Sequence, residues 1–175
     1  MVEPLFDYKI GVIGSKYPLD FSKEQAFRLG QILASNRCAV VCGGLQGVME
    51  EVCRGAKSIN GITIGILPGK QDSEANPFVD IIIPTGLGKI RNNLIVYASH
   101  GIIAVEGESG TLNEITTAWM SEKPIAVLKH TGGWSSKLAD SKLDSQYQNF
   151  IYGAESPEDA VRYVLVSIKQ KTQII

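Results

Sequence analysis

The chain has 175 residues, of which 44% are hydrophobic and 20% charged, and its formal net charge is −1. This length suffices for a domain with a buried core, and the near-neutral charge, without a basic block, argues against a nucleic-acid partner. No apolar run approaches the ~18 residues of a membrane span. The first residues lack the features of a signal peptide, so we expect a cytoplasmic protein without a membrane partner.

Short apolar runs alternate with longer amphipathic stretches along the whole chain. In chain order we expect strand 8–14, helix 22–36, strand 38–44, helix 47–59, strand 61–69, loop 70–77, strand 79–84, helix 89–100, strand 101–107, helix 110–122, strand 124–129, loop 130–148, strand 150–153 and helix 156–171.

Two of the expected helices carry recognisable start signals. Ser22 is a plausible N-cap for the first helix. The last helix has Ser156 at its N-cap, Pro157 at its first position and acidic residues in its first turn.

Apolar strands separated by helices indicate a parallel sheet that is covered on both faces. With right-handed crossovers, this gives an α/β fold of the Rossmann-like doubly wound type, with helices on both faces. We find no linker or repeat, so residues 1–175 are expected to form a single Rossmann-like nucleotide-binding domain.

The cysteines and histidines do not indicate a metal site. Cys38, Cys42 and Cys53 contain no C-x-x-C pair, and two of them stand in the apolar run "CAVVCGG". A buried small apolar side chain is the favoured interpretation for those two. His100 and His130 are isolated and lack the spacing of metal ligands.

Ligands of doubly wound folds bind beyond the carboxyl ends of the strands, where glycine-bearing turns begin the helices. The turn "GVIGSK" offers Gly14 and Ser15 as ligand contacts. The turn "CGGLQGVM" offers Gly43, Gly44 and Gly47, which allow close backbone approach to an anion. The alternative for these glycines is a tight turn that needs glycine for packing.

A third turn, "GESGTLNE", supplies Ser109, Gly110 and Thr111 beside a helix N-terminus, which favours a phosphate. Glu106 and Glu108 oppose this, because a carboxylate several ångströms from a phosphate costs about 1 kcal/mol. Either these side chains point outward, or the turn holds a ribose or a neutral ring face.

Arg91 and Glu114 are a candidate acid–base pair. Arg91 falls in the first turn of the helix at 89–100, where a cation usually needs an anionic partner, here Glu114 or a ligand phosphate. The alternatives are a surface arginine, and a capping box in which Thr111 and Glu114 have T-x-x-E spacing. Lys89 is expected to be solvated.

The segments "GGLQGVMEEVCRGA", "TIGILPG", "TGLGKIRNN" and "GTLNE" together resemble the Lonely Guy-like family, whose members are often mislabelled lysine decarboxylases. The similarity spans roughly residues 9 to 129 and is strongest to the branch of molybdenum cofactor carrier proteins. Some family members are phosphoribohydrolases that release a base from a nucleoside monophosphate. Members form dimers or tetramers, so the resemblance implies a homo-oligomer.

The hydrolases of this family carry the pattern P-G-G-x-G-T-x-x-E together with an R-K pair. The matching residues in this sequence are Gly107, Gly110, Thr111, Glu114 and Arg91.

Three positions depart from the hydrolase pattern. Glu106 replaces the proline, Glu108 replaces the second glycine and Asn92 replaces the lysine. The turn at Gly43 is also one residue shorter than is common in the group. These changes remove backbone freedom and positive charge, and they add negative charge.

The resemblance and the residues together imply a binding protein for a phosphorylated heterocycle, either a nucleotide or a molybdopterin-type cofactor. The alternative is a nucleoside 5′-monophosphate phosphoribohydrolase in which Glu114 and Arg91 are catalytic. A third possibility is an interaction module with a vestigial site. None of these requires a resident cofactor or metal.

Overall fold

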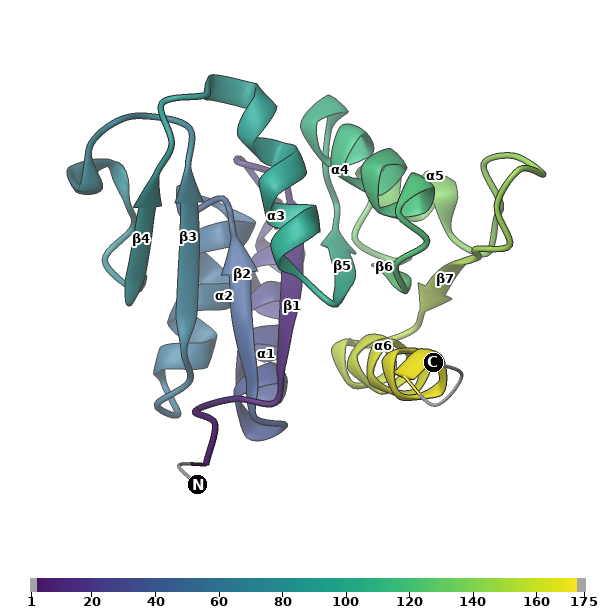
Figure 1. Cartoon of the computed structure of the whole chain (residues 1–175), viewed down its shortest axis with the longest axis horizontal. Helices are drawn as coiled ribbons and strands as arrows, with labels where there is room; N and C mark the ends of the chain where they lie inside the picture. Colours follow the sequence, from purple (N-terminus) through teal and green to yellow (C-terminus); the bar gives the residue numbers. More distant parts are fainter. Residues whose placement is uncertain (1–2, 173–175) are drawn as a thin grey trace.

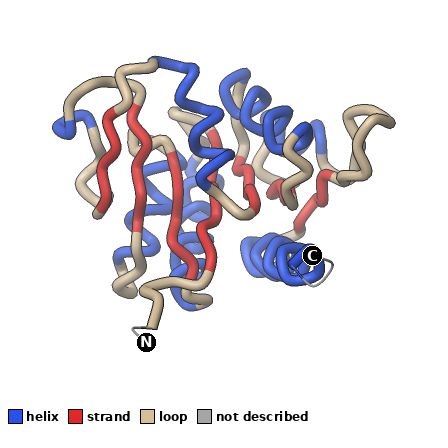
Figure 2. The backbone as a smooth tube through the Cα atoms, viewed as in Figure 1, coloured by secondary structure: helices blue, strands red, loops and turns tan. Residues whose placement is uncertain are grey.

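The computed structural model describes residues 3–172 of the chain. A parallel sheet of seven strands carries helices on both faces (Figures 1 and 2). The elements are β1 (Tyr8–Gly14), α1 (Asp20–Ser35), β2 (Cys38–Cys42), α2 (Val48–Lys57), β3 (Thr63–Leu67), the 3-10 turn η1 (Asp72–Glu74), β4 (Ile81–Pro84), the 3-10 turn η2 (Gly88–Arg91), α3 (Asn92–Ala98), β5 (Gly101–Val105), α4 (Ser109–Met120), β6 (Ile125–Leu128), α5 (Gly133–Leu138), β7 (Ile151–Ala154) and α6 (Pro157–Thr172).

The strand order is β4-β3-β2-β1-β5-β6-β7, and every neighbouring pair is parallel. This confirms the Rossmann-like doubly wound sheet. The chain runs outward from β1 to β4, then returns and runs outward on the other side from β5 to β7. The direction of winding therefore reverses between β1 and β5, whose last residues Gly14 and Val105 are in register. A ligand site is expected above this switch point.

Two apolar cores lie on opposite faces of the sheet, because alternate side chains of each strand point to opposite sides. In β1, Ile10 and Val12 pack toward α1, α2 and α6, whereas Ile13 packs toward α3 and α4. In β5, Ile103 joins the first core and Ile102 the second. Both cores hold the strand ends rigidly beneath the turns that form the site.

The structure corrects one of the predicted helix starts. The first helix begins at Asp20 with Leu19 at its N-cap position, so Ser22 is not the cap. Ser22 is buried inside the helix, and its hydroxyl donates to the carbonyl of Thr131 at 3.2 Å. For the last helix the prediction is confirmed, since the Ser156 hydroxyl accepts a hydrogen bond from the amide of Asp159.

The long loop expected at 130–148 contains the short helix α5, which was not predicted from the sequence. Its first turn contacts the β5–α4 turn. The backbone amide of Trp134 donates a hydrogen bond to the carbonyl of Gly107, and that of Ser135 donates to the carbonyl of Glu106. Within residues 3–172, none of the helices combines the length and the apolar character that a membrane crossing demands.

Candidate functional site

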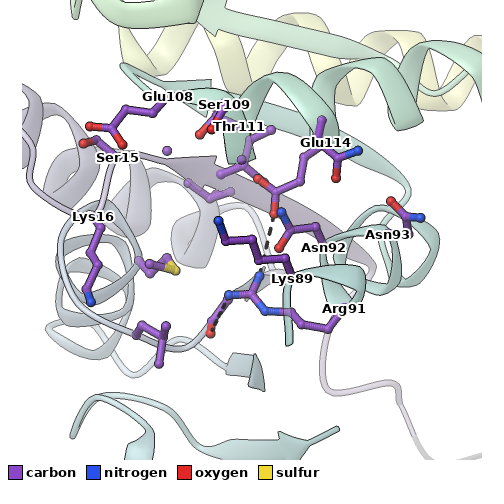
Figure 3. Close-up of a pocket in the computed structure, with 18 of the residues that line it drawn as sticks. Ser15, Lys16, Lys89, Arg91, Asn92, Asn93, Glu108, Ser109, Thr111 and Glu114 are labelled. Carbon is purple, nitrogen blue, oxygen red and sulfur yellow. Dashed lines mark hydrogen bonds and ion pairs between the residues drawn. The ribbon is translucent and has the colours of Figure 1, made fainter. Parts of the chain in front are cut away.

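A cavity of about 690 Å³ lies above the switch point of the sheet. Four segments form its wall: the turn after β1, the turn after β2, the segment from η2 into α3, and the first turn of α4 (Figure 3). Its volume falls within the range of ~300 to 1,000 Å³ that is typical of small-molecule sites. The cavity therefore lies where a doubly wound fold binds ligands.

The start of α4 supplies hydrogen-bond donors to this cavity. Glu108 is the N-cap residue, and the first helical hydrogen bond runs from the amide of Leu112 to the carbonyl of Glu108. The amides of Ser109, Gly110 and Thr111 thus have no acceptor within the helix. A Cβ on Gly110 would meet only the Asn92 side chain, at 3.7 Å, so this terminus is open to a ligand.

The turn after β2 contacts the side chain of Arg91 directly. The carbonyl of Gly43 accepts a 3.5 Å hydrogen bond from Nη2 of Arg91. A Cβ on Gly43 would lie 2.4 Å from that nitrogen and 2.7 Å from Sδ of Met49. A side chain at position 43 would therefore require the ends of Arg91 and Met49 to shift from their observed positions.

Arg91 and Glu114 form a close, buried pair. Nη1 of Arg91 lies 3.7 Å from Oε1 of Glu114, and only 8% and 7% of the two side chains are exposed. The surface interpretation of Arg91 is thus wrong. The capping-box interpretation of Glu114 is also wrong, because α4 begins at Ser109 and Thr111 lies inside its first turn.

Burial dominates the electrostatics of this pair. Desolvation raises the pKa of Glu114 to about 8, although the nearby Arg91 charge acts in the opposite direction. Burial likewise lowers the pKa of Arg91, against the attraction of Glu114. Burial therefore favours the protonated form of Glu114, in which Arg91 contributes an uncompensated positive charge to the cavity.

Arg91 has one further unsatisfied group. Its Nε is buried and finds no acceptor among the described residues, a situation that is rare in folded proteins. An acceptor atom of a ligand or a water would satisfy this nitrogen.

Glu106 and Glu108, the two carboxylates of the β5–α4 turn, have different environments. Glu106 adopts a positive φ of 58°, and its carboxylate accepts a hydrogen bond from the amide of Leu19 at 3.1 Å. Glu108 instead lines the cavity beside Ser15 (Figure 3). Of the two sequence alternatives, outward orientation applies to Glu106, and the conflict with an anion remains for Glu108.

Two of the proposed glycines serve the turn after β2 rather than the cavity. Gly47 has φ +77°, and a Cβ there would lie 2.4 Å from the carbonyl oxygen of Lys16. Gly44 has φ +70° and packs on Gly65. The structure places neither of them in the wall of the main cavity. The amide of Val48, which follows Gly47, is also unavailable to a ligand, because it donates to the carbonyl of Ser15.

The remaining predicted residues are brought together. The cavity wall contains Gly14, Ser15, Gly43, Arg91, Ser109, Gly110, Thr111 and Glu114.

Other residues of the wall were not predicted from the sequence. Lys16 and Lys89 both line the cavity, and both are exposed to solvent, as was expected for Lys89. Asn93 lines it too, and its amide oxygen accepts a hydrogen bond from the hydroxyl of Thr117 on α4. Lys16 could have been found from its position directly after the Gly14–Ser15 turn. Asn93 could have been found from the quoted segment "TGLGKIRNN", which it ends.

The cysteines lie beneath the site rather than in it. Cys38, Cys42 and Cys53 have free thiols and are buried, as was predicted for Cys38 and Cys42. Sγ of Cys42 lies 3.5 Å from Sγ of Cys53. Within residues 3–172, no three His, Cys, Asp or Glu side chains converge to hold a metal ion.

Known proteins share this architecture and part of the sequence. An uncharacterized protein of Archaeoglobus fulgidus is 41% identical over 121 residues, which span 69% of this chain and 80% of the relative. The molybdenum cofactor binding protein of the phototrophic bacterium Rippkaea orientalis is 34% identical, with a TM-score of 0.83, and the match covers 94% of this chain and 99% of that one.

A second solved structure is the molybdenum cofactor carrier protein of Chlamydomonas reinhardtii. It is 30% identical with a TM-score of 0.78, and the match covers 95% of this chain and 99% of that one. These similarities confirm the resemblance to carrier proteins that the sequence motifs indicated. The model of the SLOG cluster4 family matches residues 7–161. The chain therefore belongs to the SLOG cluster4 family.

Proposed function

We propose that this protein binds a small phosphorylated heterocyclic ligand, a nucleotide or a molybdopterin-type cofactor, and acts as its carrier. The observation that carries the proposal is the cavity at the switch point, with the open N-terminus of α4 on its wall. The similarity to two proteins that are named for binding or carrying the molybdenum cofactor supports the cofactor as cargo.

The residues of the cavity fit such a ligand. The amides and hydroxyls of Ser109 and Thr111 would hold a terminal phosphate, and Arg91 would supply positive charge. Accessible apolar side chains on the wall, such as Tyr17 and Leu45, offer a surface for a heterocycle.

The alternative function is phosphoribohydrolase activity, and the specific observation that favours it is the Arg91–Glu114 pair. In that reaction Glu114 would stabilise positive charge on the ribosyl carbon or position water. Its raised pKa opposes this role, because a protonated carboxyl has no negative charge to stabilise the ribosyl carbon and cannot act as a base toward water. Hydrolysis through Glu114 would therefore increase as the pH rises past about 8.

Base release separates the two functions. Wild type and Glu114→Gln are incubated with a panel of nucleoside 5′-monophosphates at pH 7 and pH 9, and free base is measured by chromatography. A carrier shows thermal stabilisation by a ligand without base release. Release by wild type at pH 9, absent in Glu114→Gln, would establish the hydrolase instead.

We further propose that the protein forms a homo-oligomer. Apolar side chains are exposed along η2 and α3, at Ile90, Leu94 and Tyr97, and on the edge strand β4, at Ile81 and Ile83. An apolar surface of this kind is typical of a protein–protein contact.

A further inference from the structure

Two acidic side chains, the buried Glu114 and the exposed Glu108, line the cavity among many hydrogen-bond donors. Glu108 lines the cavity and is exposed, and no hydrogen bond or ion pair of its carboxylate is found among residues 3–172. Its backbone serves as the N-cap of α4, but its side chain makes no capping bond. The carboxylate of Glu108 is therefore free to contact a ligand, and it is not needed to hold the helix.

The groups around Glu108 make its chemistry distinctive. Ser109 and Thr111 offer hydroxyls and free amides, and Lys16 adds a cation on the neighbouring turn. An ionised carboxylate, in contrast, only accepts hydrogen bonds. A ligand that pairs with these donors and also with the Glu108 carboxylate must therefore carry hydrogen-bond donors near its anionic group.

We propose that Glu108 is a specificity-determining residue, which accepts hydrogen bonds from a vicinal pair of donors on the ligand. Two sources share this chemistry: the cis-diol of a ribose, and the N–H edge of a 2-aminopyrimidin-4-one ring, which occurs in guanine and in pterins. This inference rests on the proposed function, since it assigns a selective contact within the same cavity.

A second observation, at Arg91, also points to a ligand with mixed polarity. Arg91 is 7% exposed, it stands on the cavity wall, and its Nε has no acceptor among the described residues. A buried donor of this kind requires an acceptor. The wall thus presents a buried donor without a protein acceptor at Arg91 and a solvent-exposed acceptor without a protein donor at Glu108, which together suit a ligand with both kinds of group.

The alternative is that Glu108 merely repels anions. A carboxylate near a bound phosphate weakens its binding by about fivefold when both are solvated. Repulsion acts on every phosphorylated ligand alike, whereas a hydrogen bond acts only on ligands that carry the donors. The two effects therefore differ in their dependence on ligand structure.

Four nucleotides and one pterin test the proposal by titration calorimetry. AMP carries the diol, 2′,3′-dideoxy-GMP carries the ring edge, GMP carries both, and 2′,3′-dideoxy-AMP carries neither. The phosphate ester of 6-hydroxymethylpterin carries the ring edge without a ribose. We expect wild type to bind at least one of the donor-bearing ligands about 10- to 100-fold more tightly than dideoxy-AMP. Tighter binding of AMP than of dideoxy-AMP would identify the diol as the source of the donors. Tighter binding of dideoxy-GMP or of the pterin would identify the ring edge.

Glu108→Gln should abolish this preference and bind dideoxy-AMP about fivefold more tightly. Glu106→Gln is the matched control, because Glu106 contacts Leu19 outside the cavity, and it should keep the wild-type preference. Thermal unfolding of both variants shows whether they remain folded.

Three results would overturn the inference while leaving the proposed function intact. They are equal tightening of all ligands by Glu108→Gln, binding by wild type without any preference for the donors, and the same loss of preference in Glu106→Gln. If wild type bound none of the five ligands, the proposed function would fail together with this inference.

Discussion

The guanidinium of Arg91 and the carboxyl of Glu114 lie 3.7 Å apart, at Nη1 and Oε1, although both are almost completely removed from water. Taking both charges out of water costs more than a pair at this distance returns, so the neutral form of Glu114 is favoured. The pair is thus a source of positive charge at neutral pH. This property suits an anion-binding cavity better than it suits a catalytic carboxylate.

The first prediction concerns stability against pH. The pKa of Glu114 rises from 4.5 to about 8 on folding, so the native state binds more protons than the unfolded state between these values. The free energy of unfolding should therefore fall as the pH rises from about 4.5 to 8, by on the order of a few kcal/mol, and then level off. Urea unfolding at pH 5, 7 and 9 measures this.

Glu114→Gln is the control for that titration. The amide does not ionise, so the variant should lose the decline and should be the more stable protein at pH 9. A decline of equal size in the variant would show that another group is responsible.

The second prediction concerns Gly43. The Cβ of Gly43→Ala would meet the guanidinium of Arg91 at 2.4 Å and should displace it, with a loss of roughly 1–3 kcal/mol of stability and weaker binding of anions. Gly110→Ala is the matched control, since its Cβ has only a 3.7 Å contact. It should keep its stability while narrowing the cavity. Thermal unfolding of Gly43→Ala that matches wild type would contradict the close approach.

The third prediction concerns Glu106, which stands where the related hydrolases carry proline. Its φ of 58° is closed to proline, and its amide donates to the Thr131 hydroxyl at 2.7 Å. Glu106→Pro should therefore destabilise the protein by about 3 kcal/mol or more. Glu106→Gly keeps the backbone amide, and glycine tolerates a positive φ, so this variant should lose much less stability than Glu106→Pro. A folded Glu106→Pro protein with an unchanged melting temperature would show that this turn can adopt the hydrolase conformation.

The sequence predicts the fold well because apolar runs and turn residues act locally. The strands at Tyr8–Gly14 and Gly101–Val105 stand out as continuous apolar runs, and most of their residues are buried. The predicted start of α1 was wrong, because Ser22 is held by the distant carbonyl of Thr131, a contact without any local signature. The helix at Gly133–Leu138 was missed for a similar reason, since its first turn is anchored on the β5–α4 turn.

The sequence predicted site residues best where a glycine-bearing turn also carries ligand-binding side chains. The start of α4 has both, and Ser109, Gly110 and Thr111 line the cavity. Two glycines after β2 were proposed as ligand contacts, but Gly44 and Gly47 do not line the cavity, and their positive φ values are needed by the turn. Whether a turn residue faces the cavity depends on how the turn packs against the rest of the fold, and the sequence does not show this.

The fourth prediction concerns self-association. If the exposed apolar face of α3 is an oligomer interface, light scattering after size exclusion should give a mass that is a multiple of 19.0 kDa. Leu94→Lys places a charge on that face and should shift the protein to the monomer. Val166→Lys, at an exposed apolar position of α6, is the control and should leave the mass unchanged. A monomeric wild type would contradict this proposal.

The most direct test of the account is equilibrium binding of nucleoside 5′-monophosphates and a pterin phosphate to wild type, Thr111→Val and Thr116→Val, with free base assayed in the same samples. Thr111 lines the cavity, whereas the Thr116 hydroxyl donates to the carbonyl of Asn113 within the same helix. The account predicts saturable binding without base release, weakened about tenfold by Thr111→Val and unchanged by Thr116→Val. Absence of binding by wild type, or base release at neutral pH, would contradict it.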